Sequence, residues 1–258
     1  MEAAVVDAGS KLLKAGPTIP DQSPSIIIPT QMKRVLEEGS VNESSLSEDI
    51  TVDPVVRGYI RDWDAMEDLL HHVLYTGLGW EIGNEGQILF TDPLSIPKAA
   101  REQLVQLMFE TFNISGFYAS EQAVLSLYAV GRISGCTADI GHGKIDIAPV
   151  IEGAVHHIAS RRFEIGAQEL GKSNPFSATY SLFCAGFEEG FQKEAGLCSS
   201  AIRPALVKPP EYMPENLTMY SAWVGGAILA KVVFPQNQHV TKADYDENGP
   251  SVVHRKCF

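Results

Sequence analysis

The chain has 258 residues, of which 45% are hydrophobic and 20% charged, and its formal net charge is −12 at pH 7. This length and composition are those of a globular protein with a sizeable core, and the acidic balance argues against a protein that coats DNA, since phosphate binding needs clustered Lys and Arg. No apolar run is long enough to span a bilayer and no basic leader stands at the start, so we expect neither a membrane protein nor a secreted one.

The first predicted elements are short strands. AAVVD at 3–7 is expected to form a strand, with KLLKA at 11–15 as its partner beyond a tight turn. SIIIP at 25–29 is a third short strand, closed by a proline. Residues 35–53 are acidic, rich in Ser and poor in aromatic residues, which predicts a mobile surface loop or a small subdomain.

Three helices are predicted next. From Asp62 onward apolar residues recur at helical spacing, with Asp62 or Asp64 as the N-cap. Pro97 begins the second helix as a first-turn proline. Ser120 is expected to cap the third helix, which ends at Gly131.

A second hairpin is predicted at residues 136–151, and it repeats the Asp-x-Gly pattern of the first. Residues 171–200 have no regular pattern. A long apolar helix over 219–233 then precedes a short helix capped by Thr241 with Asp244. The order of elements therefore indicates two similar α/β halves, each opened by a hairpin.

The cysteines and histidines do not indicate a metal site. The four cysteines lack CxxC spacing, so we expect reduced thiols and a cytosolic or nuclear protein. The histidine pairs at 71–72 and 156–157 are adjacent, and adjacent helical residues do not share a face.

The two hairpin turns carry the residue types of a phosphate site. Glycine lets the backbone approach a ligand closely, and backbone N–H groups that point into a cleft can hold phosphate oxygens. Asp7 and Asp139 would then face a shared Mg²⁺, mostly through water, and Lys14 would add a positive charge. Asp-x-Gly is also a common tight turn, so the pairing of two such hairpins, rather than either one, favours the site.

Several segments, in this order, resemble the actin family. They cover most of residues 1–165 and 187–258, and they are VVDAGSKLLKAG, DWDAMEDLLHHVLY, PKAAREQLVQLMFETFN, QAVLSLYAVGRISG, YSAWVGGAILA and DYDENGPSVVHRKCF. The resemblance implies an α/β protein with the actin/Hsp70/sugar-kinase fold, in which two ribonuclease-H-like halves enclose an ATP cleft. It also implies an intact first half and a truncated second half, because the family continues after FEIG at 163–166 with a small subdomain and an adenosine loop that have no counterpart here.

The resemblance divides the chain into three parts. The large subdomain of the first half would comprise residues 1–29, 58–130 and 221–258, and a small divergent subdomain would comprise 30–57. Residues 131–220 would be the truncated remnant of the second half, without its adenosine side and its small subdomain.

The family's nucleotide-binding residues can be matched one by one. The residues that match its cofactor-binding positions are Asp7, Gly9, Ser10, Lys14, Gln122, Asp139, Gly141 and Gly143. Among them Asp7 and Asp139 would hold Mg²⁺ through water, and Gln122 would position the attacking water. ATP with magnesium is expected to bind weakly at best, because the adenosine side of the cleft is missing.

Three departures from the family argue against hydrolysis. Lys11 replaces a glycine of the first turn, His142 replaces an aspartate of the second, and Asp146 replaces the histidine that orients water. Hydrolysis needs a water held in line with the γ-phosphate. We therefore expect no catalytic residue and no enzyme activity, and we interpret His142 as an exposed turn residue.

The divergent segments, DIGHGKIDIAPV among them, are similar to those of plant actin-related proteins. The resemblance implies a non-catalytic protein of the nucleus, and also of the cytoplasm, in a chromatin-remodelling complex that regulates gene expression. Its partners would be a helix of the remodelling ATPase and another actin-related protein or actin, with no sequence-specific nucleic acid and no membrane. The alternatives are an ATP-binding or ATP-hydrolysing protein of the same fold, a cytoskeletal protein, which the acidic loop at 36–49 disfavours, and a shortened form without function.

The truncation also predicts a packing defect. Residues 1–135 and 221–258 should form one compact unit, whereas the second hairpin should lack a cover over Ile145, Ile147 and Val150. Apolar surface left uncovered forfeits about 25 cal/mol per Å². We therefore expect residues 152–205 to be mobile and prone to association.

Overall fold

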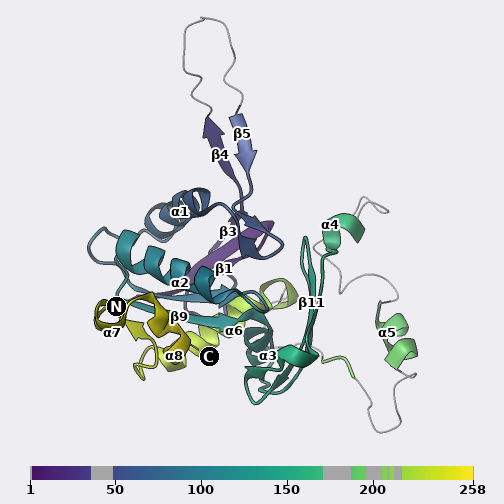
Figure 1. Ribbon diagram of the computed structural model, residues 1–258. Helices are drawn as coiled ribbons and strands as arrows, with labels where there is room; N and C mark the ends of the chain where they lie inside the picture. Colours follow the sequence, from purple (N-terminus) through teal and green to yellow (C-terminus); the bar gives the residue numbers. More distant parts are fainter. Residues whose placement is uncertain are drawn as a thin grey trace, which may run out of the picture.

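The computed structural model describes residues 2–35, 49–170, 187–195, 205–207, 210–211 and 217–257. A six-stranded mixed sheet lies at its centre, with helices on both faces, and a smaller sheet stands beside it (Figure 1). In spatial order the strands of the central sheet are β14 (Val240–Thr241), β9 (Gly116–Glu121), β8 (Gln87–Asp92), β1 (Ala3–Ala8), β2 (Leu12–Pro17) and β3 (Ile26–Pro29).

The middle of the central sheet is parallel and its flanks are antiparallel. β1 pairs with β8, and β8 with β9, in parallel, whereas β2 turns back on β1 with Asp7 opposite Lys14. The middle strands are apolar and buried on both faces, as parallel strands between two helical layers must be. The predicted first hairpin and the predicted strand over 25–29 are confirmed.

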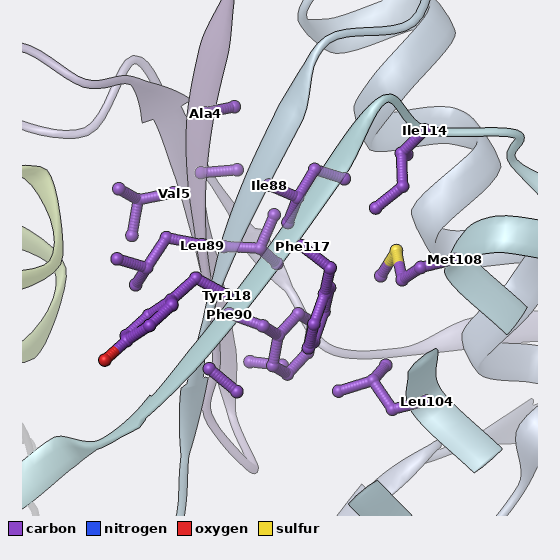
Figure 2. Close-up of a cluster of buried hydrophobic side chains, with 14 of the residues drawn as sticks. Ala4, Val5, Ile88, Leu89, Phe90, Leu104, Met108, Ile114, Phe117 and Tyr118 are labelled. Atoms are coloured by element: carbon purple, nitrogen blue, oxygen red, sulfur yellow. The ribbon is translucent and has the colours of Figure 1, made fainter. Parts of the chain in front are cut away.

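One face of the central sheet is covered by two helices. They are α1 (Trp63–His71), extended by the π-turn η1 (His72–Gly77), and α2 (Lys98–Gln106), extended by the π-turn η2 (Leu107–Thr111). Figure 2 shows Leu104, Met108 and Ile114 from this layer packed against Ile88 and Phe117 of the sheet. Asp62 is the N-cap of α1, as predicted, and its side chain accepts a hydrogen bond from the Ala65 N–H.

The other face is covered by α6 (Leu217–Val233), which packs on α3 (Gln122–Ala129). Two glycines let α6 approach α3 and the central sheet closely. A Cβ at Gly225 would overlap the backbone carbonyl of Leu125, and one at Gly226 would lie 2.9 Å from a methyl carbon of Val5. Trp223 donates a hydrogen bond from its indole to the Val5 carbonyl, so residues near both ends of the chain share one core.

The last elements close the far end of the sheet beside α2. They are α7 (Lys242–Asn248), the 3-10 turn η6 (Pro250–Val252) and α8 (Val253–Lys256). The predicted cap of α7 is confirmed as a capping box, in which Thr241 and Asp244 bond each other's backbone N–H groups. In the part of the chain that is described, no helix is long and apolar enough to cross a membrane.

The second sheet has four strands and confirms the predicted second hairpin. Its strands are β10 (Gly135–Ile140), β11 (Ile145–Ile151), β12 (Ala154–Val155) and β13 (Arg161–Phe163), and the turn η3 (His157–Ala159) lies between the last two. β11 is the central strand, with β10 on one side and β12 and β13 on the other. The sheet stands next to α3 in Figure 1.

Two short hairpins and two short helices complete the described chain. The hairpins are formed by β4 (Met32–Val35) with β5 (Asp49–Val52) and by β6 (Val55–Val56) with β7 (Tyr59–Ile60). The helices α4 (Ala167–Leu170) and α5 (Phe187–Ala195) follow the second sheet.

The structure corrects two of the predicted element boundaries. Ser120 lies inside β9, and Glu121 is the N-cap of α3 without a side-chain cap bond, because the strand runs directly into the helix. Pro97 is the N-cap of α2 rather than a residue of its first turn.

The structure adds regular elements to two segments for which none was predicted. Residues 49–52 of the acidic segment form β5, paired with β4, while 36–48 lie outside the described residues. The helix α5 interrupts the segment expected to be irregular at 171–200.

The expected exposure of the second hairpin holds for only one face. Val150 is buried, because it packs against Val124 and Leu127 of α3. Ile147, on the opposite face of the same strand, is 37% exposed. The first half thus supplies a cover for one side of the second sheet, which the family resemblance did not predict.

Candidate functional site

The first hairpin places Asp7 at the centre of a buried polar cluster. One carboxylate oxygen, Oδ1, accepts hydrogen bonds from the Thr91 hydroxyl at 2.7 Å and the Gln122 amide at 2.9 Å. The other, Oδ2, accepts a hydrogen bond from Lys14 Nζ at 2.8 Å. Three of the predicted site residues, Asp7, Lys14 and Gln122, therefore meet in one cluster, and Thr91 is an additional member that sequence reasoning missed.

Asp7 and Lys14 are an ionised pair. Burial raises the pKa of Asp7, but the Lys14 charge and the bonds from Lys14, Thr91 and Gln122 outweigh it and hold that pKa below its usual value. Burial lowers the pKa of Lys14, and Asp7, with a contribution from Asp139, reverses this and raises it. The two directions agree, so the pair stays charged across the neutral range.

The turn of the first hairpin is tied to the small hairpins beside it. The Gly9 N–H donates to the Leu12 carbonyl at 3.1 Å, and a Cβ at Gly9 would press on that same carbonyl. The Ser10 hydroxyl accepts a hydrogen bond from the Gly58 N–H at 2.7 Å. Thr30 donates its hydroxyl to the Gly9 carbonyl at 2.7 Å. The predicted residues Gly9 and Ser10 therefore lie in a turn that is held by hydrogen bonds from other segments of the chain.

The second hairpin turn is fixed in a similar way by α4. The Gly141 N–H donates to the Lys144 carbonyl, and the Gly141 carbonyl accepts from Ala167 N–H, both at 2.9 Å. A Cβ at Gly166 would overlap the backbone of the turn at His142. Asp139 lies on the preceding strand, with its side chain 48% exposed and one oxygen 3.5 Å from Lys144 Nζ.

Asp146, at the position where the family has a histidine, is locked in an ion-pair network. Arg162 donates to its two oxygens at 2.6 and 2.8 Å, and Lys144 donates to it as well. The Arg162 guanidinium also lies over the Tyr59 ring, 4.6 Å from its centroid. Burial raises the pKa of Asp146, but Arg162 and Lys144 together hold it below its usual value.

Sequence reasoning missed the partners of this network. Lys144, just before β11, and Asp146 lie at every second position with the buried residues Ala148 and Val150. All four therefore point to the face that α3 covers. Charged residues at the inward positions of a strand predict a buried ion pair, and that was the available signal. Arg162 could not be found in this way, because its pairing depends on the register of β13 with β11.

A cavity of about 320 Å³ opens between the two hairpin turns, next to the small hairpins. Its lining includes Ser10 and Gly143 among the predicted residues, and the cationic side chains of Lys11 and Arg57. His142 also lines it, and within the described chain its Nδ1 has no hydrogen-bond partner. Burial, together with the Lys11 charge, lowers the pKa of His142, which is therefore neutral at pH 7.

The cavity fits phosphate groups better than it fits a metal ion. Its volume is at the lower end of the range for small-molecule sites. Two cations and two glycine turns line it, against the carboxylate of Asp53. The carboxylates predicted to face magnesium are already bonded, Asp7 to Lys14 and Asp139 to Lys144. Among the described residues, no three His, Cys, Asp or Glu side chains are grouped so as to hold a metal.

Comparison with known proteins settles the family. The model of the actin family, described as Actin, matches residues 1–176 and 183–258. The chain belongs to the actin family. The predicted fold class is thereby confirmed: an α/β actin fold with a mixed sheet, in a chain shorter than the relatives that it matches.

Several members of the actin family align with this chain. It is 57% identical to Actin-related protein 7 of Arabidopsis thaliana over 363 residues, and 52% identical to Actin-related protein 7 of Oryza sativa over 361 residues, with 100% of both chains covered in each case. It is 31% identical to Centractin of Saccharomyces cerevisiae over 201 residues, which cover 72% of this chain and 52% of Centractin. Since this chain has 258 residues, the alignment with the Arabidopsis protein spans positions that have no counterpart here.

Proposed function

We propose that this chain is a non-catalytic actin-related protein of the nucleus, present also in the cytoplasm, that serves as a structural subunit of a chromatin-remodelling complex and so acts in the regulation of gene expression. The observation that carries the proposal is its similarity, over the whole chain, to Actin-related protein 7 of Arabidopsis and rice. Its partners would be a helix of the remodelling ATPase and another actin-related protein or actin.

The geometry of Asp146 supports a non-catalytic role. Phosphoryl transfer to water requires a group that holds the water in line with the γ-phosphate. Both oxygens of Asp146 accept bonds from Arg162, and Lys144 bonds to the same carboxylate. A carboxylate that is paired in this way and has a lowered pKa is a poor acceptor for the proton of an attacking water.

The charge of the chain supports protein partners rather than direct DNA binding. A net charge of −12 repels the phosphate backbone, whose binding depends on Lys and Arg. The same charge suits a basic helix of a partner, because complementary charges speed association and exclude wrong partners.

Co-purification tests the proposed assembly. The full chain would be co-expressed with the long helix of a remodelling ATPase and with actin, and each component would be tagged in turn. We expect a stable complex that survives gel filtration, with salt dependence of the kind that charge complementarity produces. Failure to form a complex with any remodelling ATPase helix would refute the role as a subunit.

Steady-state phosphate release tests the proposed lack of activity. We expect turnover far below the roughly 1 per second at the slow end of phosphoryl-transfer enzymes, with and without the partner helix. Turnover near that rate would show that this chain is an enzyme.

A second candidate function is ATP binding without hydrolysis, and the cavity between the hairpin turns favours it. Ser10, Lys11 and the glycine turns would hold the phosphates, whose negative charge would complement the two cations of the lining, Lys11 and Arg57. Calorimetry with Mg-ATP is the test, and we expect a dissociation constant weaker than micromolar, corresponding to less than about 8 kcal/mol of binding free energy. Lys11→Ala should weaken any binding further, whereas Lys33→Ala, outside the cavity lining, should not.

A further inference from the structure

The edge strand β10 of the second sheet presents unpaired backbone groups. Among the described residues β10 pairs with β11 alone, whereas the corresponding strand of the first hairpin, β1, lies between β2 and β8. Within the described residues, the side of β10 that corresponds to the place of β8 therefore has no partner strand. An unpaired edge is a template for another strand, because its N–H and C=O groups need partners.

The register of the hairpin shows which groups face this free edge. Gly141 donates to the carbonyl of Lys144, so these two residues form the hydrogen-bonded pair that closes the turn. Hydrogen-bonded and non-hydrogen-bonded pairs alternate along an antiparallel ladder. The backbone N–H and C=O groups of Ile140, Ala138 and Cys136 therefore point away from β11. Pro149, opposite Cys136, agrees with this assignment, because proline has no N–H to donate across a hydrogen-bonded pair.

Apolar side chains surround the same edge. Residues directly opposite one another in a sheet point to the same face, so Cys136, Ala138 and Ile140 share a face with residues of β11 and β13. The apolar members of this face are Cys136, Ala138, Ile140, Ile145, Ile147, Pro149, Ile151 and Phe163, and the cation Arg161 lies on it opposite Ile147. Ile147, Ile151 and Phe163 are 37%, 59% and 48% exposed, which is unusual for such a group on a folded protein.

β10 has few of the usual protections of an edge strand. Its sequence, GCTADI, contains no proline and no lysine, and its pairing with β11 is continuous without a bulge. Its single charge is Asp139, whose side chain points to the opposite face from Cys136 and Ala138. The strand is therefore able to pair along its whole length.

We propose that a second copy of this chain pairs with the free edge of β10, antiparallel, with Ala138 on the two-fold axis. In this register Ala138 lies opposite its own equivalent, and Cys136 lies opposite Ile140, so all three outward residues form hydrogen-bonded pairs. Asp139 lies opposite the polar residue Thr137 of the other copy. The two aspartates do not face each other, and the two apolar faces join into one continuous eight-stranded surface.

Cysteine cross-linking tests this register. The background would carry Cys136→Ser, Cys184→Ser and Cys198→Ser and keep the buried Cys257. In it, Ala138→Cys should give a disulfide-linked dimer under mild oxidation, because hydrogen-bonded antiparallel pairs have Cα atoms about 5.5 Å apart, within disulfide range. The matched control is Thr137→Cys, which lies opposite Asp139 rather than itself and should cross-link several-fold less.

Analytical ultracentrifugation of the full chain tests the association itself. We expect a monomer–dimer equilibrium, and Ala138→Lys should raise its midpoint concentration by at least about tenfold, equivalent to about 1.4 kcal/mol. Ile82→Lys, which replaces an 83% exposed apolar residue elsewhere, should leave the midpoint unchanged. Circular dichroism would verify that both variants remain folded.

The outcomes separate the proposal from its rivals. A chain that stays monomeric at about 100 μM, at which weak homodimers associate, overturns the proposal. Equal cross-linking of the two cysteine variants also overturns it, because the copies then meet elsewhere or without a fixed register. If the chain is monomeric alone and Ala138→Lys abolishes binding of a different protein, the edge belongs to that partner and the proposal is wrong.

Discussion

Asp146 illustrates how one residue changes the chemistry of a cleft. It lies in the second hairpin at a position where the family has an imidazole, and it bonds Arg162 and Lys144 instead of being free to meet a ligand. The network connects β11, β13 and, through Arg162, the ring of Tyr59 in β7. Its role in this molecule is to hold the second sheet against the small hairpins.

Asp146→Asn should therefore destabilise the protein. Its side chain is 6% exposed, and removal of one partner of a buried ion pair costs about 3–5 kcal/mol because the other charges are left uncompensated. The free energy of unfolding in urea measures the loss. Asp139→Asn is the matched control, since it contacts the same lysine with a side chain that is 48% exposed and should cost less than about 1 kcal/mol. Equal losses would mean that Asp146 is not the centre of the network.

Asp92 should give the stability a measurable pH dependence. It is fully buried beside Arg101, and burial raises its pKa to about 6 despite that partner. This pKa lies above the value of about 3.9 in the unfolded chain, so the folded state binds the proton more tightly. The stabilisation by protonated Asp92 is therefore complete below about pH 3.9 and is lost as the pH rises through about 6. The free energy of unfolding measured from pH 4 to 7 should fall less steeply with pH in Asp92→Asn than in the wild type. Identical slopes would show that Asp92 does not titrate in this range.

At the scale of elements, the contact between α3 and α6 depends on a missing side chain. Gly225→Ala should destabilise the fold by about 3 kcal/mol or more, although alanine favours a helix by about 1 kcal/mol, because the new Cβ would overlap the Leu125 carbonyl. Gly190→Ala, in α5, is the control, since a Cβ there meets nothing within 4 Å. Thermal unfolding of both variants measures the difference. A Gly225→Ala protein as stable as the wild type would show that the helices can separate at no cost.

Elements with a strong local pattern could be predicted from the sequence, and those decided by distant contacts could not. The capping box of α7 lies within four residues and was found, as were both hairpins. β5 was missed because its four residues end an acidic, Ser-rich segment, and the strand is stabilised by its pairing with β4. Ser120 was mistaken for a cap, since nothing local shows that β9 continues through it.

For the candidate site, too, local contacts could be predicted from the sequence and distant ones could not. Asp7 and Lys14 could be placed together because they belong to one hairpin, and Gln122 through the family resemblance. Thr91 and Arg162 were missed, because their contacts depend on strand order and register. The Lys14 and Lys144 bonds to the predicted magnesium-facing carboxylates could not be foreseen from residue type alone.

At the scale of the whole molecule, the two sheets should differ in local stability. The central sheet is covered on both faces, whereas the second sheet has α3 on one face and an exposed apolar face on the other. Amide hydrogen exchange at a protein concentration low enough to prevent association should show slow exchange in β1, β8 and α3 and much faster exchange in β12 and β13. Protection of β12 and β13 equal to that of α3 would mean that residues 152–163 are held as firmly as the core.

The hydrogen bond between Trp223 and Val5 has a consequence for folding during translation. The two residues are 218 positions apart, and α6 supplies the layer that covers one face of β1. A ribosome makes about 5–20 residues per second, so the first strand waits on the order of ten seconds or more before its covering helix exists. During that time the nascent chain exposes the apolar strand β1, because the helix α6 that covers it has not yet been synthesised. A ribosome that stalls before α6 emerges would therefore leave a product that depends on chaperones.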